Sequence, residues 1–245
     1  MRLDKFLSET ATATRSDAKR AIRGGAVTVN GVPVRQSDAA VDPERDVVLF
    51  RGERVIYRKY IYVLLNKPDG YVSATEDGRE KTVLDLLPEE MSKKGVFPCG
   101  RLDKNTLGLM LLTDNGELAH RILSPKNHVE KKYRFRSKFP LDPEDVSRFE
   151  AGVTLDDGYV TKPARIELDD TFDSGVITLH EGKYHQIKRM LDALSNKIVY
   201  LERISFANLT LERSGLERGE WRYLDEDEIK ELEKIAGFDK ASDKI

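Results

Sequence analysis

The residues of this sequence that are best suited to chemistry lie in one short segment, GRLDKNTLGLMLLTDNG, at residues 100–116. It holds a carboxylate, Asp103, between two cations, Arg101 and Lys104, which would stabilise its negative charge. A carboxylate of this kind can attack an electrophilic carbon or accept a proton. The same residues could also form an ordinary ion pair on a surface loop, and their types alone leave both interpretations open.

The segment also predicts the elements that would position Asp103. Gly100 opens a loop, and residues 107–112 form a dense apolar run that is typical of a buried strand. The dipeptide Asn115-Gly116 marks the turn that follows it. We therefore expect Asp103 on a loop that runs directly into a strand of the core.

Two further stretches carry groups that could act with Asp103. EKKYRFRSK, at residues 130–138, alternates between apolar and charged positions and predicts a half-buried strand with Tyr133 on its inner face. EGKYHQIKRM, at residues 181–190, predicts a loop that enters a helix near His185, with Lys188 and Arg189 on that helix. Without further context, Tyr133 could be a core residue and the two cations a solvated surface pair.

These stretches resemble the motifs of a known family. GRLD-x-x-T-x-GL-x-LLTD-x-G is similar to the catalytic signature of the pseudouridine synthases of the RsuA family, LLNKPDGYVS to their opening motif and EGKYHQIKRM to their third motif. The resemblance implies that Asp103 is the essential carboxylate, that Tyr133 stacks on the target base, and that Lys188 pairs with Asp103. Most branches of the wider family have Arg where this sequence has Lys188, so Arg189 could share or replace its role.

The N-terminal region is basic, with 12 Lys and Arg against 8 Asp and Glu in residues 1–60, although the whole chain has a net charge of −2. We expect two helices, the second capped by Ser16, followed by a hairpin turning at Asn30-Gly31. The order RLDKFLSETATATRSDAKRAIRGGAVTVNG resembles the αL RNA-binding domain of a small-subunit ribosomal protein. A solvated basic surface is the alternative. The predicted RNA contacts are Arg2, Lys5, Arg15, Lys19, Arg20 and Arg23 here, and Arg101, Lys131, Lys132 and Arg189 in the rest of the chain.

Composition narrows the function further. Cys99 is the only cysteine, which excludes disulfides within the chain and cysteine-based zinc sites. No apolar run reaches the roughly 18 residues of a membrane span, and the start lacks the apolar core of a signal peptide, so we expect a cytoplasmic protein. No glycine-rich phosphate-binding pattern occurs, and we expect neither a cofactor nor a metal.

The expected architecture is α+β. We predict a small αL RNA-binding domain with its linker at residues 1–58, a pseudouridine synthase domain with a largely antiparallel mixed sheet at 59–237, and a disordered tail at 238–245.

The resemblance implies an isomerase that converts a specific uridine of small-subunit (16S) ribosomal RNA to pseudouridine, most like the enzymes that modify uridine 516. Its partner would be that RNA or a small-subunit assembly intermediate, and we expect a monomer. Asp103 could attack the sugar or the base, or assist proton removal from the sugar. Two alternatives stay open: a synthase for large-subunit (23S) RNA, and a non-catalytic RNA-binding or ribosome-assembly factor.

Overall fold

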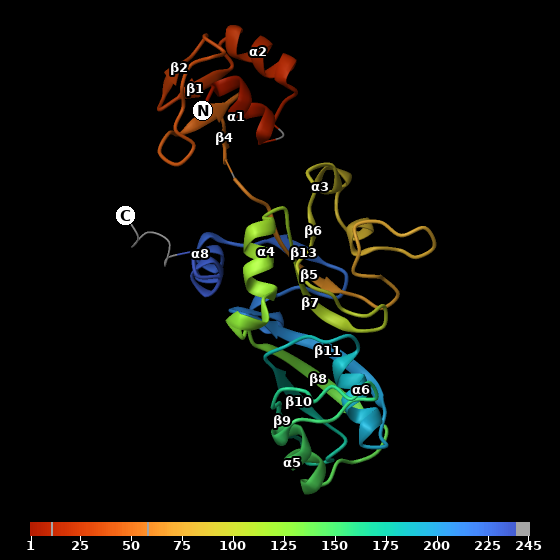
Figure 1. Ribbon diagram of the computed structural model, residues 1–245. Helices are drawn as coiled ribbons and strands as arrows, with labels where there is room; N and C mark the ends of the chain where they lie inside the picture. The colour runs from red at the N-terminus through yellow and green to blue at the C-terminus, as the bar shows by residue number, and fades with distance from the viewer. Residues whose placement is uncertain (11, 58, 239–245) are drawn as a thin grey trace. The chain divides into compact units, whose positions relative to one another are not determined.

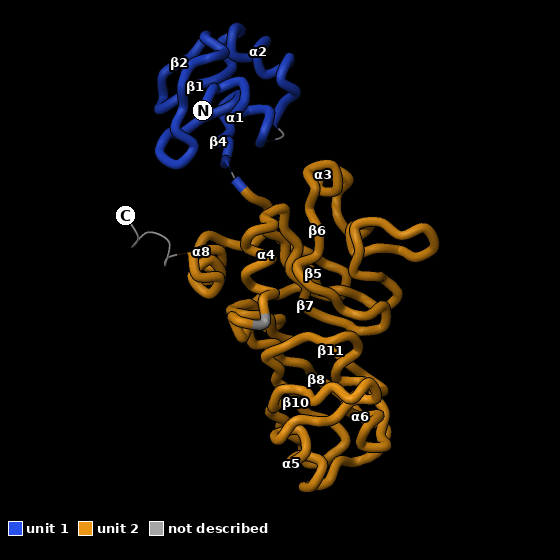
Figure 2. Tube along the Cα trace, in the orientation of Figure 1, with its two compact units in different colours: residues 1–59 blue, residues 60–245 orange. Residues whose placement is uncertain are grey.

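The computed structural model describes residues 1–10, 12–57 and 59–238. The chain divides into two compact units, Met1–Lys59 and Tyr60–Ile245, which Figure 2 shows in different colours. The tail expected to be disordered lies outside the described residues from 239 onward. Phe238, the first residue of that tail, packs against a core cluster and against the guanidinium of Arg121.

The first unit is a pair of helices on a small antiparallel sheet. Its helices are α1 (Leu3–Glu9) and α2 (Arg15–Arg23), and its sheet has the order β2-β1-β3-β4. These strands are β1 (Val27–Val29), β2 (Val32–Pro33), β3 (Val48–Phe50) and β4 (Glu53–Val55). Asn30 and Gly31 both have positive φ, as a two-residue hairpin requires. Thr14, not Ser16, caps α2, because its side chain accepts the amide hydrogen of Asp17.

The second unit is built on one large mixed sheet. Within residues 60–238, nine strands pair in the order β13-β5-β7-β11-β8-β10-β9, with β12 added to β11 and β6 added to β7. Their bounds are β5 (Tyr62–Lys67), β6 (Phe97–Pro98), β7 (Leu107–Thr113), β8 (Lys131–Ser137), β9 (Arg165–Leu168), β10 (Ser174–Leu179), β11 (Ile198–Phe206), β12 (Leu209–Thr210) and β13 (Trp221–Tyr223). Among these described strand pairs only β7 and β11 run parallel. This confirms the predicted α+β class and its largely antiparallel sheet.

Side chains of the central strands point alternately to the two faces of this sheet, and each face has its own hydrophobic core. Val63 and Leu65 join one cluster, whereas Tyr62 and Leu64 join the other. The first face is covered by η1 (Val83–Leu86), α3 (Glu89–Lys93), α5 (Pro143–Ala151) and α6 (Gln186–Ala193), and the second by α4 (Gly116–Leu123) and α8 (Glu226–Ile235). Figure 1 shows α4 and α8 near one end of the sheet, and α5 and α6 near the other. The short helices η2 (Pro125–Asn127) and α7 (Leu211–Ser214) lie between strands.

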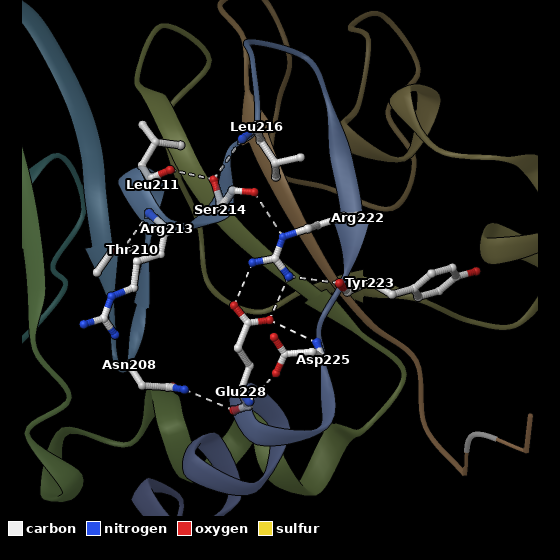
Figure 3. Close-up of polar contacts among 10 residues, drawn as sticks. All are labelled: Asn208, Thr210, Leu211, Arg213, Ser214, Leu216, Arg222, Tyr223, Asp225 and Glu228. Atoms are coloured by element: carbon white, nitrogen blue, oxygen red, sulfur yellow. Dashed lines mark hydrogen bonds and ion pairs between the residues drawn. The ribbon is translucent and has the colours of Figure 1, made fainter.

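A polar network fixes the C-terminal helix α8 to the edge of the sheet (Figure 3). Both terminal nitrogens of Arg222, on β13, donate to the two carboxylate oxygens of Glu228 at 2.7 Å. Asp225 caps the helix by accepting the amide hydrogen of Glu228. The hydrogen bond from Arg222 lowers the pKa of Glu228. The network lies apart from the catalytic motifs, and we assign it to the scaffold.

Close backbone approach dictates a glycine where β7 meets β11. Gly108 has φ +97°, and a Cβ at this position would lie 2.3 Å from the carbonyl oxygen of Arg203. The parallel pairing of β7 with β11 therefore depends on the missing side chain. This junction directly follows the loop that carries Asp103.

As for the helices of the described segments, none is long and apolar enough to cross a membrane.

Candidate active site

Asp103 lies on the loop between β6 and β7, as the sequence predicted. This loop is held by Lys67, the last residue of β5, whose side chain is fully buried. Its ammonium group donates to the carbonyl oxygens of Pro68, Lys104 and Thr106 at 3.1, 2.9 and 2.8 Å. Burial lowers the pKa of Lys67 to about 8. A single buried cation thus joins the Asn-Lys-Pro turn to the part of the loop that follows Asp103.

A second link holds the start of the loop. The hydroxyl of Ser73 donates to the carbonyl oxygen of Leu102 at 2.7 Å and accepts its amide hydrogen at 2.9 Å. The amide of Thr106 donates to the carbonyl oxygen of Asp103 at 3.0 Å and closes a tight turn. The backbone around Asp103 is therefore preorganised.

Both carboxylate oxygens of Asp103 are engaged by the first turn of α6. The ammonium group of Lys188 lies 2.5 Å from Oδ2, and Nε2 of His185 lies 3.2 Å from Oδ1. Lys188 also donates to Oδ1 of Asn105 at 2.7 Å. The side chains of Asp103 and Lys188 are 24% and 22% exposed, so water still reaches the pair. The structure thus brings Lys188 to Asp103, and it adds His185 as a second partner.

His185 reaches Asp103 because of an unusual backbone conformation. As the N-cap of α6 it has φ +48°, in the left-handed region that β-carbon-bearing residues rarely adopt. A buried network holds this turn: Gln186 donates to Glu181 at 2.7 Å, and Glu181 accepts the Tyr159 hydroxyl at 2.8 Å. Such strained residues persist where the surroundings overdetermine them, commonly at functional sites.

Two cations of the motifs, each next in sequence to a residue of the Asp103–Lys188 pair, have other partners. Arg189 contacts Asp156 and Asp157, on the loop before β9, with its guanidinium. The ammonium group of Lys104 lies 2.6 Å from Glu80. Neither of them contacts Asp103. The cation that pairs with Asp103 comes from a helix some 85 residues further on, not from its own loop.

Asp103 opens onto a cleft of about 730 Å³ in the second unit. Tyr133, on β8, lines the same cleft and is 8% exposed. Leu201 and Arg203, on β11, also line the cleft, and Arg203 lies directly opposite Tyr133 in the strand register. A cleft of this size accommodates a nucleotide-sized ligand.

Buried positive charge collects beneath this cleft. Lys131 is 9% exposed, and burial lowers its pKa to about 8, with the charge of Arg203 contributing next. Arg203 is 2% exposed and donates to the carbonyl oxygen of Leu109, but its Nη2 has no hydrogen-bond partner in the described part of the chain. Both cations flank the ring of Phe206. Lys131, which we predicted to contact RNA, is thus mostly covered. Lys132 pairs with Glu130 at 3.4 Å, and Arg101 is exposed at the cleft.

Three of the six predicted RNA contacts of the first unit lie around one buried carboxylate. Asp4 is fully buried, and Arg2, Arg15 and Lys19 approach it at 3.0, 3.7 and 3.9 Å. The hydrogen bond from Arg2 lowers the pKa of Asp4. The other predicted contacts are exposed: Lys5 pairs with Glu9, Arg20 pairs with Asp17, and Arg23 lies at the end of α2.

Sequence reasoning missed three residues of this site. The contact of His185 with Asp103 was not predicted, because a left-handed N-cap leaves no mark in the sequence. Arg203 was not singled out, and only its place beside Tyr133 in the sheet reveals it. Lys67 was recognised as part of a motif, but its three carbonyl partners depend on loops that are distant in sequence.

A carboxylate at a cleft on a mixed sheet, in a chain that also carries a small basic unit, fits an RNA-modifying enzyme, and comparison with known proteins identifies its family. The RNA pseudouridylate synthase family matches residues 61–193, and the S4 domain matches residues 1–47. The chain belongs to the RNA pseudouridylate synthase family, and it is an isomerase. This confirms the family that the motifs predicted.

Similar full-length proteins support the same assignment. The chain is 46% identical over 233 residues to "Uncharacterized RNA pseudouridine synthase YtzG" of Bacillus subtilis, covering 94% of this chain and 97% of that one. It is 40% identical over 230 residues to "Ribosomal small subunit pseudouridine synthase A" of Escherichia coli, covering 94% and 98%. A crystal structure of a pseudouridylate synthase matches with a TM-score of 0.66 and 38% identity, covering 95% of this chain and 99% of the other.

Proposed function

We propose that this protein isomerises one uridine of small-subunit ribosomal RNA to pseudouridine, with Asp103 as the reactive group. The observation that carries the proposal is the placement of Asp103 at the cleft, with Lys188 and His185 on its two oxygens. Relatives named as small-subunit synthases, which align over nearly the whole chain, support the choice of RNA. Uridine 516 of 16S RNA is the proposed target.

The reaction breaks the bond between ring nitrogen N1 and the sugar, rotates the uracil and rejoins it through C5. Asp103 attacks the sugar or ring carbon C6, or removes a proton from the sugar. Lys188 and His185 orient its oxygens for this step. No group donor is needed, because every atom of the uridine is retained.

Tyr133 supplies a surface for the base. Its ring lines the cleft that Asp103 borders, and stacking requires only a π face. The uridine must leave its stack to reach this depth, so we propose that it flips out of the RNA. In the first unit, the cations held around Asp4 would contact phosphates. The substrate is ribosomal RNA or a small-subunit assembly intermediate, bound in the cytoplasm by a single copy of the chain.

The deciding experiment maps pseudouridine in ribosomal RNA from cells with and without this protein. We expect one small-subunit position to lose its modification and to regain it when the wild-type chain is supplied, but not when Asp103→Asn is supplied. Asn keeps the size of Asp but cannot act as a nucleophile. Loss at a large-subunit position instead would contradict the choice of RNA. Full restoration by Asp103→Asn would contradict the role of the carboxylate.

A further inference from the structure

We infer that Tyr184 is a stacking platform for the base that adjoins the target uridine in the RNA chain. The inference deepens the proposed function and rests on it, because it concerns the RNA bound at the same cleft. It assigns a binding contact to a residue that the catalytic reaction does not require.

Tyr184 is exposed to an extent that is unusual for an aromatic side chain. At 71% it exceeds every other large apolar or aromatic residue that is exposed in the described segments. It nevertheless lines the cleft, where Tyr133, another of the lining tyrosines, is only 8% exposed. Large apolar surface left in water is unfavourable, so a ring held at the mouth of a binding cleft indicates a contact made with a ligand.

The ring of Tyr184 is held in one position. It stacks on the imidazole of His185 with the ring centroids 3.8 Å apart and the planes 17° apart. The imidazole covers one face of the phenol, and the high exposure of Tyr184 leaves the other face open. This stack exists because the left-handed backbone of His185 folds its ring back beside that of the preceding residue.

The loop that carries Tyr184 is anchored on both sides of it. The amide of Lys183 donates to the side chain of Gln186 at 3.0 Å, and the ammonium group of Lys183 lies 4.2 Å from the ring centre of Tyr159. Gln186 is in turn bound to the buried carboxylate of Glu181. Because the loop is fixed, little conformational entropy is lost when a ligand stacks on Tyr184.

The surroundings favour a nucleobase as the ligand. Seven Lys and Arg side chains line the same cleft, among them Arg101, Lys162 and Lys183, and they attract a polyanion. Aromatic side chains bind bases of single-stranded RNA by stacking, without regard to sequence.

The connection to Asp103 specifies which base this is. A single ring, that of His185, separates Tyr184 from the carboxylate, since it stacks on the phenol and lies 3.2 Å from Oδ1. The base on Tyr184 therefore belongs to a nucleotide directly next to the uridine that reaches Asp103. The same contact would hold the neighbour in place while the uridine is flipped out.

The test uses the full-length chain and a short RNA hairpin copied from the sequence around the uridine that the mapping experiment identifies. Tyr184→Ala should weaken binding about 5- to 150-fold, the range that corresponds to the loss of one base stacked on an aromatic side chain. Tyr184→Phe should bind like the wild type, since the ring remains. Phe139→Ala is the matched control, because Phe139 is 52% exposed but does not line the cleft, and it should change nothing. The loss should appear in KM, with kcat retained, because the contact is present in the bound state and in the transition state alike.

Abasic nucleotides identify the partner of the ring. With the base removed on the correct side of the uridine, wild type and Tyr184→Ala should bind equally well, whereas removal on the other side should preserve their difference. Equal binding of the two proteins to the intact hairpin, or a difference that survives both abasic substitutions, would overturn the inference. These results are distinct from failure of the proposed function, in which the wild-type chain itself would convert no small-subunit uridine.

Discussion

Replacing Lys188 by Ala tests the pairing at Asp103 most directly. The ammonium group of Lys188 lies 2.5 Å from Oδ2 of Asp103, and the two side chains are about three-quarters covered. Hydrogen bonds to charged groups of this kind contribute about 1.5–3 kcal/mol. If that stabilisation serves the transition state, Lys188→Ala should slow single-turnover isomerisation about 10- to 150-fold. His185 still engages the other oxygen, which favours the lower half of the range.

The assay is release of tritium from RNA labelled at C5 of uridine, measured with enzyme in excess so that product release does not limit the rate. Lys188→Arg should retain more activity than Lys188→Ala, because a guanidinium restores a cation beside Asp103 and Asn105. Arg189→Ala is the matched control. It breaks contacts with Asp156 and Asp157, whose side chains are 77% and 57% exposed, so the stability of the protein should change little.

Two outcomes would refute this reasoning. If Lys188→Ala kept the full single-turnover rate while Arg189→Ala lost it, the functional cation would be Arg189, and the contact with Asp156 and Asp157 would have to break on RNA binding. If both variants were fully active, the ion pair with Asp103 would have no catalytic role. In either case circular dichroism and thermal unfolding should first show that the variants are folded.

Three further predictions follow from the scaffold. Gly108→Ala should destabilise the protein by on the order of 2 kcal/mol or more, because its Cβ would meet the carbonyl oxygen of Arg203 at 2.3 Å. Gly116→Ala, with open space around it at the start of α4, should be neutral or slightly stabilising. Urea unfolding compares the two variants, and equal stabilities would contradict the packing argument. Deleting residues 1–59 should leave the second unit folded on its own two cores, yet weaken RNA binding and flatten its dependence on salt, and an unchanged salt slope in filter binding would show that the first unit makes no phosphate contacts. Burial lowers the pKa of Lys67 to about 8 from about 10.4 in the unfolded chain, so the unfolded state binds more protons between these pH values. The stability of the wild type relative to Lys67→Met should therefore rise as the pH increases from 8 to about 10. A stability difference that stays constant with pH would show that the pKa of Lys67 is not lowered.

Much of the fold could be predicted because local signals and tertiary structure agree. The apolar run at 107–112 became β7, and the alternating residues around Tyr133 became β8 with its buried inner face. Errors arose where two local solutions were equally good. Thr14 and Ser16 are both strong N-cap residues, and the structure uses the first.

The directions of charged side chains could not be predicted, because they depend on segments that are remote in sequence. Lys104 follows Asp103 directly, yet it pairs with Glu80, 24 residues earlier. Adjacent residues on a loop need not face each other, so proximity in sequence was a poor guide to the partners of Asp103. The resemblance to known motifs supplied Lys188 instead, and the structure is consistent with it.

The geometry of α6 explains in physical terms why Lys188, and not Arg189, reaches Asp103. His185 is the N-cap of this helix and Lys188 is its third residue, so they are three positions apart and share one face. Arg189 follows about 100° further round the helix and faces the loop that carries Asp156. From an N-cap at His185, helical periodicity places both residue 188 and residue 189 near its face, and the contacts of Arg189 with Asp156 and Asp157 leave Lys188 as the partner on the carboxylate. A single element, the first turn of α6, therefore holds both oxygens of Asp103, one through His185 and one through Lys188.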